Sequence, residues 1–484
     1  MEAIYMNFEF INEKLFAAPT ELAQRSSDKD NVAQKYRTMF MRDRDRVLYS
    51  RAFRRLSGKT QIYLSGSDDH QRTRLTHTLE VSQIAATISQ ALGLDRDLTE
   101  AIALGHDIGH TPFGHAGEQV LHEIMVPNEG QLVNDTAYND ENTDCAGFLG
   151  FKHNFQSVRI AVALENIYGD FGLDLTNYTL WGLQRHSSYE YKKNRISVKH
   201  LKPDAYEQYQ KCYAIKGHEG EIAWSFEAFV VAEADEIAQL HHDLEDAIRG
   251  NAMSRKEVCK TVKDNIFSIM DSNDRELLSR MKNAIMDDES FVVSLSRVVV
   301  NTLVNRIIEK SLLNLIKIQK KYQLNKDNIN DLFIAHSPTE TEIAQAISYD
   351  SCGEELRIST LLRKYSQTIG TKVHNSFVVQ RMNTKGQYII RKLFQAYYTN
   401  PQQLPNHSII QYLIEVDKYK SKESAIRAIT SNGEGAVRTK FESFRKSPAF
   451  KDKISKLKLM RVICDHIAGM TDSYAIDEFK KLYN

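Results

Sequence analysis

Apolar residues recur along most of this chain at the spacing of amphipathic helices. In residues 72–92 they follow one another at intervals of three to five positions, which places them on one helical face: Leu75, Leu79, Ile84, Ile88 and Leu92. The same periodicity is strong over residues 224–246 and 291–322, and a charged helix is expected after residue 150. The pattern predicts an all-α protein.

Two local patterns mark where helices begin and end around residue 100. Asp97 and Glu100 have the form of a capping box, which predicts the start of a helix. This helix runs into His106 and Asp107 and is expected to stop at the glycines that follow. Residues 187–220 are rich in tyrosine and lysine with weak periodicity, and we interpret them as an insertion or an irregular hairpin.

Residues 36–63 are dense in arginine. A solvated helix whose arginines pair with Asp43 and Asp45 accounts for most of these charges.

Composition sets the scale of the protein and leaves its partners open. A chain of 484 residues suggests two or three units, at roughly 150 residues per domain. From the shift in motif density we expect an N-terminal extension (1–35), a core carrying the chemistry (36–250) and a helical C-terminal region (251–484). Basic and acidic residues balance at 63 each, so global charge neither favours nor excludes nucleic acid.

Cysteine use and hydropathy indicate a cytoplasmic protein. The cysteines are scattered, odd in number and form no CxxC, which fits a reduced compartment: Cys145, Cys212, Cys259, Cys352 and Cys464. The N-terminus lacks a basic flank followed by an apolar run, so no signal peptide is expected. No stretch is expected to supply the roughly 18 apolar residues of a membrane helix.

Candidate chemistry is concentrated in residues 106–118, with the sequence HDIGHTPFGHAGE. Three histidines, two carboxylates and three glycines stand within these thirteen residues. An adjacent His-Asp pair offers one nitrogen and one oxygen ligand to a divalent cation. The glycines break the helix and let the backbone approach a ligand closely. The segment predicts a metal-centred hydrolase.

Four residues on three expected helices form a plausible ligand set: His77, His106, Asp107 and Asp235. Two imidazoles and two carboxylates leave coordination positions for water and substrate. Asp235 lies within an apolar run, where a carboxylate is costly to bury without a partner. Taken singly, each of these residues is more often a solvated or locally hydrogen-bonded side chain, and the hypothesis rests on the set.

The chain resembles the HD-domain phosphohydrolases and, within them, the deoxyguanosinetriphosphate triphosphohydrolase (dGTPase) family. The resemblance is carried by blocks in family order over most of the chain, among them RTRLTHTLEV at 72–81 and HDIGHTPFGHAGE at 106–118. Further blocks lie at 42–61, 151–159, 172–176, 234–246 and 469–475. The implied fold is the helical HD core with an additional C-terminal helical region.

The resemblance assigns roles to individual residues. It implies that His77, His106, Asp107 and Asp235 hold the metal. It also implies that His115 and Glu118 activate and orient the attacking water, with His110 beside the triphosphate. The implied substrate contacts are Gln61, Arg74, Asn154, Gln156, Arg185, Gln239, Asp243, Asp472 and Tyr474.

The chain departs from the family pattern at three places. Gln239 stands where a tyrosine often stacks under the sugar, and Arg185 and His186 stand where a Lys-Tyr pair is frequent. Thr111 replaces a common proline.

The implied reaction is hydrolysis of dGTP, with other dNTPs left open, to the deoxynucleoside and inorganic tripolyphosphate. The implied cofactor is one divalent ion per subunit, Mg²⁺ or Mn²⁺ ahead of Fe²⁺ or Co²⁺, since the donor set discriminates poorly between them. The implied assembly is a homo-oligomer, hexameric by resemblance. One alternative keeps the HD core but acts on another nucleotide, as a nucleotidase or phosphodiesterase.

A second alternative is a regulatory protein that binds nucleotides or single-stranded DNA. Residues 438–461 contain nine basic and two acidic residues with interleaved aromatics: Phe441, Phe444 and Phe450. Basic and aromatic residues together are typical of single-stranded nucleic-acid grooves and of phosphate-binding effector sites. An amphipathic helix with a solvated lysine face explains the same pattern and is the more common outcome.

Overall fold

The computed structural model describes residues 13–27, 35–61, 72–125, 150–185, 211–283, 285–335, 340–351, 357–433 and 435–483. Within them the protein is all-α apart from one antiparallel hairpin of β1 (Ala214–Ile215) and β2 (His218–Ile222). The all-α prediction is confirmed. The hairpin begins inside residues 187–220, for which an insertion or an irregular hairpin was expected, and residues 187–210 of that segment lie outside the described residues.

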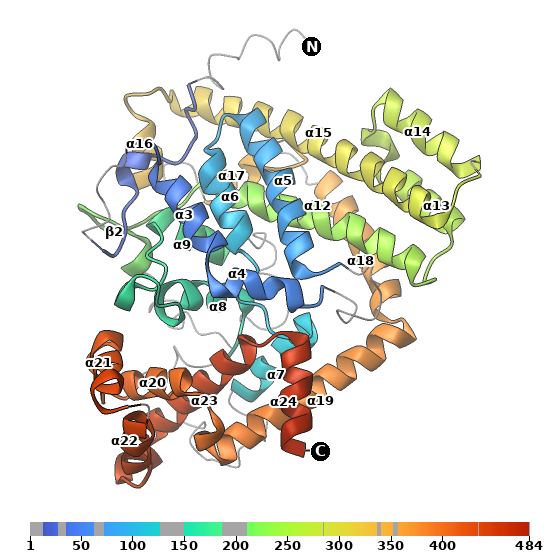
Figure 1. Ribbon diagram of the computed structural model, residues 1–484. Coiled ribbons are helices and arrows are strands. Elements are labelled where there is room, and N and C mark those ends of the chain that lie inside the picture. Colours follow the sequence, from blue (N-terminus) through green and yellow to red (C-terminus); the bar gives the residue numbers. More distant parts are fainter. Residues whose placement is uncertain are drawn as a thin grey trace.

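A first hydrophobic core is built around α12 (Phe226–Arg249), which packs against α5, α6, α9, α15 and α18. Its other main helices are α3 (Met39–Leu48), α5 (Arg74–Leu92), α6 (Arg96–Gly105), α9 (Asn177–Arg185), α15 (Asp288–Tyr322) and α18 (Arg357–His374). They form the upper part of the molecule in Figure 1. Residues on both sides of position 250 contribute to this core.

A second hydrophobic core lies below the first in Figure 1 and joins α7 to the C-terminal helices. Its helices are α7 (Gly114–Met125), α19 (Phe377–Thr399), α20 (Asn406–Glu415), α22 (Gly435–Arg445), α23 (Lys453–Ala468) and α24 (Asp472–Tyr483). α7 comes directly after α6 in sequence, yet its apolar residues Val120, Leu121 and Ile124 pack with α19 and α23. Residues 106–118 therefore cross from one core to the other.

Shorter elements surround the two cores. The remaining α-helices are α4 (Arg51–Arg55), α8 (His153–Arg159), α13 (Arg255–Ile266), α14 (Ser272–Asn283), α16 (Ile329–Ala335), α17 (Glu340–Ala346) and α21 (Lys422–Asn432). The single turns are η1 (Thr20–Leu22), η3 (Leu56–Gly58), η7 (Gly169–Phe171), η8 (Phe267–Ile269), η9 (Pro401–Gln403) and η10 (Pro448–Lys451), with a π-helical turn at η6 (Ile160–Leu164). α8 follows Gly150, as the sequence predicts.

The cap of α6 differs from the predicted capping box. The helix begins two residues earlier, because the side chain of Asp95 accepts a hydrogen bond from the backbone N–H of Leu98. Glu100 instead binds Arg44 and Arg96. The predicted end is correct, since α6 stops at Gly105 and His106 is its C-cap.

The arginine-rich segment is less solvated than the sequence predicts. Arg37 does pair with Asp45 at an exposed position, with 3.2 Å between Nη1 and Oδ2. Asp43, however, is fully buried, where it pairs with Arg25 and accepts hydrogen bonds from the backbone N–H and hydroxyl of Thr176. The prediction of a solvated ion pair is therefore wrong for Asp43, because tertiary packing gives this carboxylate buried partners.

Helix α15 corrects the expectation that no stretch of the chain is apolar enough, over a sufficient length, to cross a membrane. By length and composition it could cross a membrane, although half of its most apolar window is buried within the protein. It packs against α12, α14 and α5, as a core helix does.

Buried polar contacts hold the turn between α6 and α7 at the boundary of the two cores. Lys59 donates from Nζ to the backbone oxygens of His110 and of Ala468, the latter at 2.8 Å. Asp472 accepts hydrogen bonds from the backbone N–H groups of Phe113 and Thr60, each at 2.9 Å. The start of α24 therefore fixes the backbone that leads to His115.

Phe113 and Gly114 enter α7 in the left-handed region, with φ of +60° and +57°. Phe113 is buried against α19, where Gly386 gives its ring room to approach the helix backbone. A Cβ at Gly386 would lie 2.7 Å from both Cβ and Cγ of Phe113. The fit between these two residues supports a backbone conformation that is unfavourable for phenylalanine.

We predict that Gly386→Ala destabilises the protein by about 1–3 kcal/mol, because overpacking forces Phe113 or α19 to move. Thermal or denaturant unfolding measures the effect. Gly370→Ala on α18 is the matched control, since its new Cβ would come no closer than 3.6 Å to another residue. This control should be neutral or stabilising by up to about 1 kcal/mol. Equal stability of the two variants would contradict the close packing of Phe113 on Gly386.

Candidate metal centre

Three helices bring His77, His106, Asp107 and Asp235 together. His77 projects from the first turn of α5, whose N-cap Thr73 accepts from the backbone N–H of Thr76. His106 and Asp107 follow the last turn of α6, and Asp235 lies in the middle of α12. The packing of α5 against α6 and α12 therefore places all of them at one point.

The donor atoms of this group lie close together. His77 Nε2 is 3.0 Å from Asp235 Oδ1 and 3.8 Å from Asp107 Oδ2. His106 Nε2 is 3.4 Å from Asp107 Oδ1 and 3.9 Å from Asp235 Oδ1. Separations of this size are those of atoms that share one cation at about 2.0–2.2 Å.

The chemistry of the group also fits a divalent ion. His106 Nδ1 lies 2.6 Å from the backbone oxygen of Ala103, which directs Nε2 toward the carboxylates. Burial alone would raise the pKa of Asp235, but the hydrogen bond from His77 and the charge of His106 hold that pKa below its usual value. Both the ring orientation and an ionised carboxylate are what a metal ligand requires.

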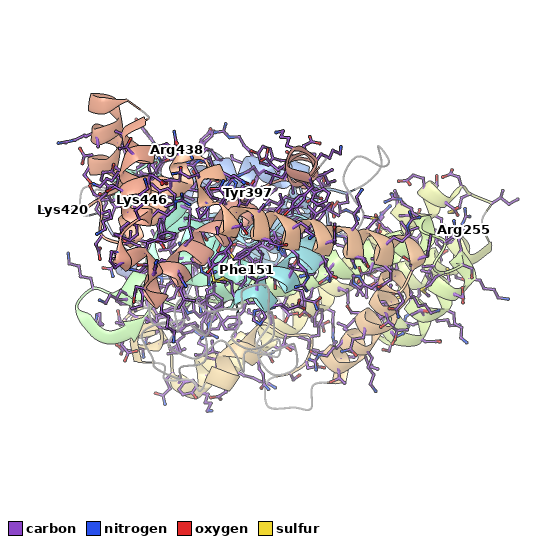
Figure 2. All side chains as sticks on the ribbon, turned by 90° about the horizontal axis from the view of Figure 1, so that it is seen from below. Phe151, Arg255, Tyr397, Lys420, Arg438 and Lys446 are labelled. Carbon is purple, nitrogen blue, oxygen red and sulfur yellow. The ribbon has the colours of Figure 1, made fainter. Side chains whose placement is uncertain are left out.

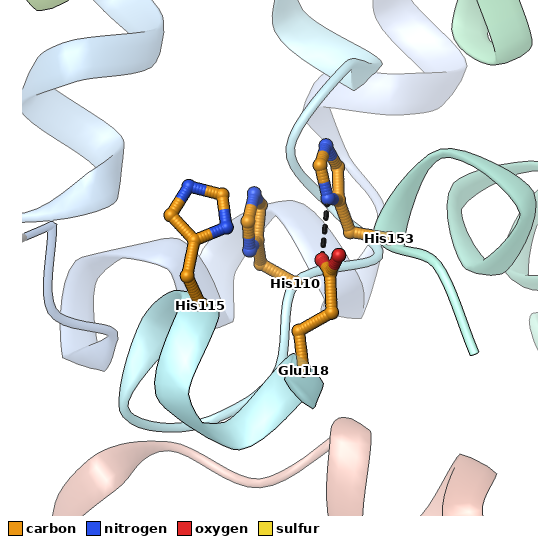
Figure 3. A group of neighbouring side chains, drawn as sticks. All are labelled: His110, His115, Glu118 and His153. Atoms are coloured by element: carbon orange, nitrogen blue, oxygen red, sulfur yellow. Dashed lines mark hydrogen bonds and ion pairs between the residues drawn. The ribbon is translucent and has the colours of Figure 1, made fainter. Parts of the chain in front are cut away.

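A second group lies beside the first and consists of His110, His115, Glu118 and His153 (Figure 3). His110 joins the two groups, because its Nε2 is 3.2 Å from Asp107 Oδ1. The ring of His153 stacks on that of His110 with 3.9 Å between centroids. His115 and Glu118 lie on α7, and His115 is the exposed member of the group.

Glu118 binds His153. His153 Nδ1 lies 2.6 Å from Glu118 Oε2, and Lys152 Nζ donates to Oε1 at 2.8 Å. Among the described residues, these are the hydrogen-bond partners found for Glu118, and His115 is not one of them. The expectation that Glu118 orients His115 directly is therefore replaced by an orienting contact to His153.

His153 was not singled out from the sequence. It stands within the block at 151–159 that carried part of the family resemblance, and its position in that block was the available signal. Its distance in sequence from residues 106–118 hid its place in the cluster.

Electrostatics keep His110 and His115 neutral and Glu118 charged. Burial, followed by the charges of Arg74 and His153, lowers the pKa of His110 well below its usual value. Desolvation also lowers the pKa of His115, although Glu118 acts in the opposite direction. Burial would raise the pKa of Glu118, but His153 and Lys152 outweigh it and hold the pKa well below its usual value. A neutral His115 is able to accept a proton.

Arg74 offers unused hydrogen-bond donors at the same place. Its Nη1 donates to Asp107 at 2.7 Å, whereas Nε and Nη2 are buried without a hydrogen-bond partner. A Cβ at Gly114, the first residue of α7, would lie 3.1 Å from Arg74 Nη2 and 3.6 Å from the backbone oxygen of Gln61. Buried donors without partners beside a helix N-terminus form an environment that favours an oxyanion.

Several of the predicted substrate residues lie on α12, α8 and α9. Asp235, Gln239 and Asp243 lie on one face of α12 at intervals of four residues. Asn154 is buried with Nδ2 3.3 Å from the backbone oxygen of Gln184, and Arg185 at the end of α9 lies over the ring of Trp181.

Other predicted substrate residues belong to the boundary between the two cores. Gln156 donates to Asp465 on α23 at 2.9 Å. Both carboxylate oxygens of Asp472 accept hydrogen bonds from Thr60 and Phe113, so this side chain positions the turn before α7. Tyr474 is 47 % exposed on α24.

In the basic segment 438–461, two of the three interleaved aromatic rings are buried in the second core, and Phe450 packs against it partly buried. Phe441 and Phe444 are buried in the second core, and Arg438 donates to Asn406 and to the backbone oxygen of Leu404. Figure 2 shows Arg438 and Lys446 near Lys420 at one end of the molecule. The amphipathic-helix explanation of this pattern is therefore confirmed for Phe441 and Phe444, because the core takes the rings that a nucleic-acid groove would need.

The comparisons with known proteins agree with the geometry. Residues 74–168 match the family described as HD domain, and residues 441–481 match the family described as Phosphohydrolase-associated domain. The first match contains His77, His106, Asp107, His115 and Glu118. HD domains are metal-dependent, which agrees with the His and carboxylate groups found here.

Several relatives that share one name are similar to this chain, two of them over nearly its full length. The deoxyguanosinetriphosphate triphosphohydrolase-like protein of Bartonella henselae is 30 % identical over 100 % of this chain and 98 % of its own length. The protein of that name from Bartonella tribocorum is 31 % identical over 99 % of this chain and 97 % of its own length. The one from a Ruegeria species is 40 % identical over 52 % of this chain. The chain thus belongs to the deoxyguanosinetriphosphate triphosphohydrolase-like family of HD-domain phosphohydrolases.

Proposed function

We propose that the protein hydrolyses dGTP to deoxyguanosine and inorganic tripolyphosphate. The other dNTPs are candidate substrates of the same reaction. The observation that carries the proposal is the meeting of three features at Asp107. This carboxylate contacts the metal-ligand candidate His106, the second histidine group through His110, and Arg74 with its unused donors. Together they can bind a metal, handle a proton and hold a phosphate chain.

His77, His106, Asp107 and Asp235 would hold one divalent ion, which when bound polarises a phosphate oxygen and lowers the pKa of a coordinated water. We propose Mg²⁺ or Mn²⁺ ahead of Fe²⁺ or Co²⁺.

Arg74 is proposed to bind the triphosphate. Its free Nε and Nη2 can donate to a pair of phosphate oxygens while Nη1 stays on Asp107. The N-terminus of α7 at Gly114 lies on the same side, and its backbone N–H groups favour negative charge. Gln61, whose Oε1 is buried without a hydrogen-bond partner, completes this wall toward the sugar.

His115 is proposed to accept the proton of the attacking water at its ring nitrogen, because it is neutral and is the exposed histidine of the group. Glu118 holds His153, and His153 stacks on His110, so the three keep the neighbouring imidazoles in place. His110 then lies between Asp107 and the phosphate chain.

The nucleoside is proposed to lie along α12, where Gln239 and Asp243 continue the face that carries Asp235. Asn154, Gln156 and Arg185 would support the pocket from the α8–α9 side, and Tyr474 would approach the base. We further propose that the protein is cytoplasmic and forms a homo-oligomer, which is hexameric by resemblance. We also propose that a nucleotide or single-stranded DNA binds it as an effector.

The activity is tested by incubating the full chain with each dNTP, GTP and dGMP in the presence of Mg²⁺ or Mn²⁺ and separating the phosphate products. We expect deoxyguanosine and tripolyphosphate in equal amounts from dGTP. Release of orthophosphate from dGMP, with dGTP left intact, would instead favour the nucleotidase alternative.

His115→Ala is expected to lower turnover by about 100-fold or more, the scale typical of a lost acid–base group. Its unfolding temperature and metal content should match those of the wild type, because His115 is not among the proposed ligands. The matched control is His218→Ala on the β2 hairpin, which should retain full turnover. Near-normal turnover of His115→Ala would remove this residue from the mechanism.

Asp107→Ala is expected to lose one equivalent of Mn²⁺ relative to the wild type, together with activity. The physical reason is the loss of a ligand that also balances Arg74 and His106. Metal analysis of dialysed protein measures the change, with Asp45→Ala on α3 as the control. An unchanged metal content would show that the ligand assignment is incorrect.

A further inference from the structure

A third group of possible ligands lies on α5 and α12, the helices that carry His77 and Asp235, but outside the site described above. Glu80 is on α5, one turn after His77, and His241 and His242 are on α12, almost two turns after Asp235. One ligand atom from each lies within 4.8 Å of the others. No step of the proposed hydrolysis uses these side chains.

The two imidazoles converge on a single carboxylate oxygen of Glu80. His241 Nε2 is 3.4 Å from Glu80 Oε2, and His242 Nε2 contacts the same oxygen. The two rings are 4.2 Å apart and steeply inclined, at 71°, so their edges reach Glu80 from different directions. Arg72 lies on the other oxygen, with 3.6 Å between its Nε and Oε1, which leaves Oε2 to the imidazoles.

The surroundings of His241 are those of a metal-bound imidazole. Its second nitrogen, Nδ1, faces Glu245 Oε1 at 3.6 Å. Glu245 is itself fixed by the hydroxyl of Ser296 at 2.6 Å and by Arg72 at 2.7 Å. A carboxylate behind a ligating histidine sets the ring orientation and raises its basicity.

Burial and access both suit a bound ion. His242 is 1 % exposed, and its Nδ1 is buried without a hydrogen-bond partner. The side chain of Glu80 is 33 % exposed, so an ion can reach the group from solvent. Two imidazoles that face one carboxylate oxygen form a donor set that a single cation can share.

We propose that Glu80, His241 and His242 form a second metal site for a divalent transition ion of the zinc class. Two imidazoles and one carboxylate are a donor set that Zn²⁺ and its borderline neighbours prefer over Mg²⁺, and three protein ligands leave a position for water. The ion would tie α5 to α12 next to the first site, since the rings of His77 and His242 are 5.3 Å apart. It would thereby fix the spacing of His77 and Asp235.

The test counts zinc on the full chain after chelator treatment, reloading with Zn²⁺ and removal of excess ion. We expect two equivalents for the wild type, one for Asp107→Ala, one for Glu80→Gln and one for His241→Ala. The double variant Asp107→Ala with Glu80→Gln should bind none. Glu289→Gln and His218→Ala, the matched controls, should keep both equivalents.

A second readout in the Asp107→Ala background separates the two sites. Zinc should raise the unfolding temperature of this variant, and adding Glu80→Gln should remove the increase, because α5 and α12 are then no longer joined through the ion. One equivalent on the wild type and none on Asp107→Ala would overturn the second site while leaving the first intact.

Anomalous scattering at the zinc edge from wild-type crystals provides the measurement that needs no variant. A peak about 2.0–2.2 Å from Glu80 Oε2 and from both Nε2 atoms is expected. Density at His77 and His106 alone would show that the Glu80 group is an ion pair without metal. A failure of the dGTP assay would not affect either result.

Discussion

The turn between α6 and α7 belongs to two hydrophobic cores at once, and the site depends on this constraint. His106 and Asp107 follow a helix of the first core, whereas His115 and Glu118 stand on a helix whose apolar face packs with α19 and α23. Neither core alone can bring the two pairs together. Asp472 and Lys59 hold the connecting backbone where the cores meet, through hydrogen bonds to residues 110 and 113.

Charge compensation explains why so many ionisable groups can be buried there. Asp107 is surrounded by Arg74, His106 and His110, which outweigh the effect of burial and lower its pKa well below the usual value. Burial, followed by the charge of Arg74, lowers the pKa of His110, so this imidazole stays neutral. A single network thus provides an ionised carboxylate at Asp107, a neutral imidazole at His110 and an arginine with two unpartnered donors.

Helices α5 and α12 carry two ligand groups in succession. His77 and Asp235 belong to the first group, and Glu80, His241 and His242 form the third group. Because both helices are long and pack along their length, a restraint at one group is transmitted to the other by rigid elements rather than by loops. This arrangement gives the third group, Glu80, His241 and His242, a structural role that does not require contact with substrate.

The sequence by itself determined the main helices and indicated most of the residues that lie together at the candidate site. Periodic apolar positions located α5, α12 and α15, the glycines marked the end of α6, and the blocks of residues indicated His77, His106, Asp107, His115 and Asp235 as candidates. Only the tertiary structure decided which side chains meet. In the folded protein Glu118 binds His153, and Asp43 is buried in an ion pair with Arg25. Asp472 accepts a hydrogen bond from the backbone of Phe113 and so holds the turn before α7. Helix periodicity and capping depend on neighbours within a few residues, whereas the partner of a buried charge is set by packing between segments that are distant in the chain.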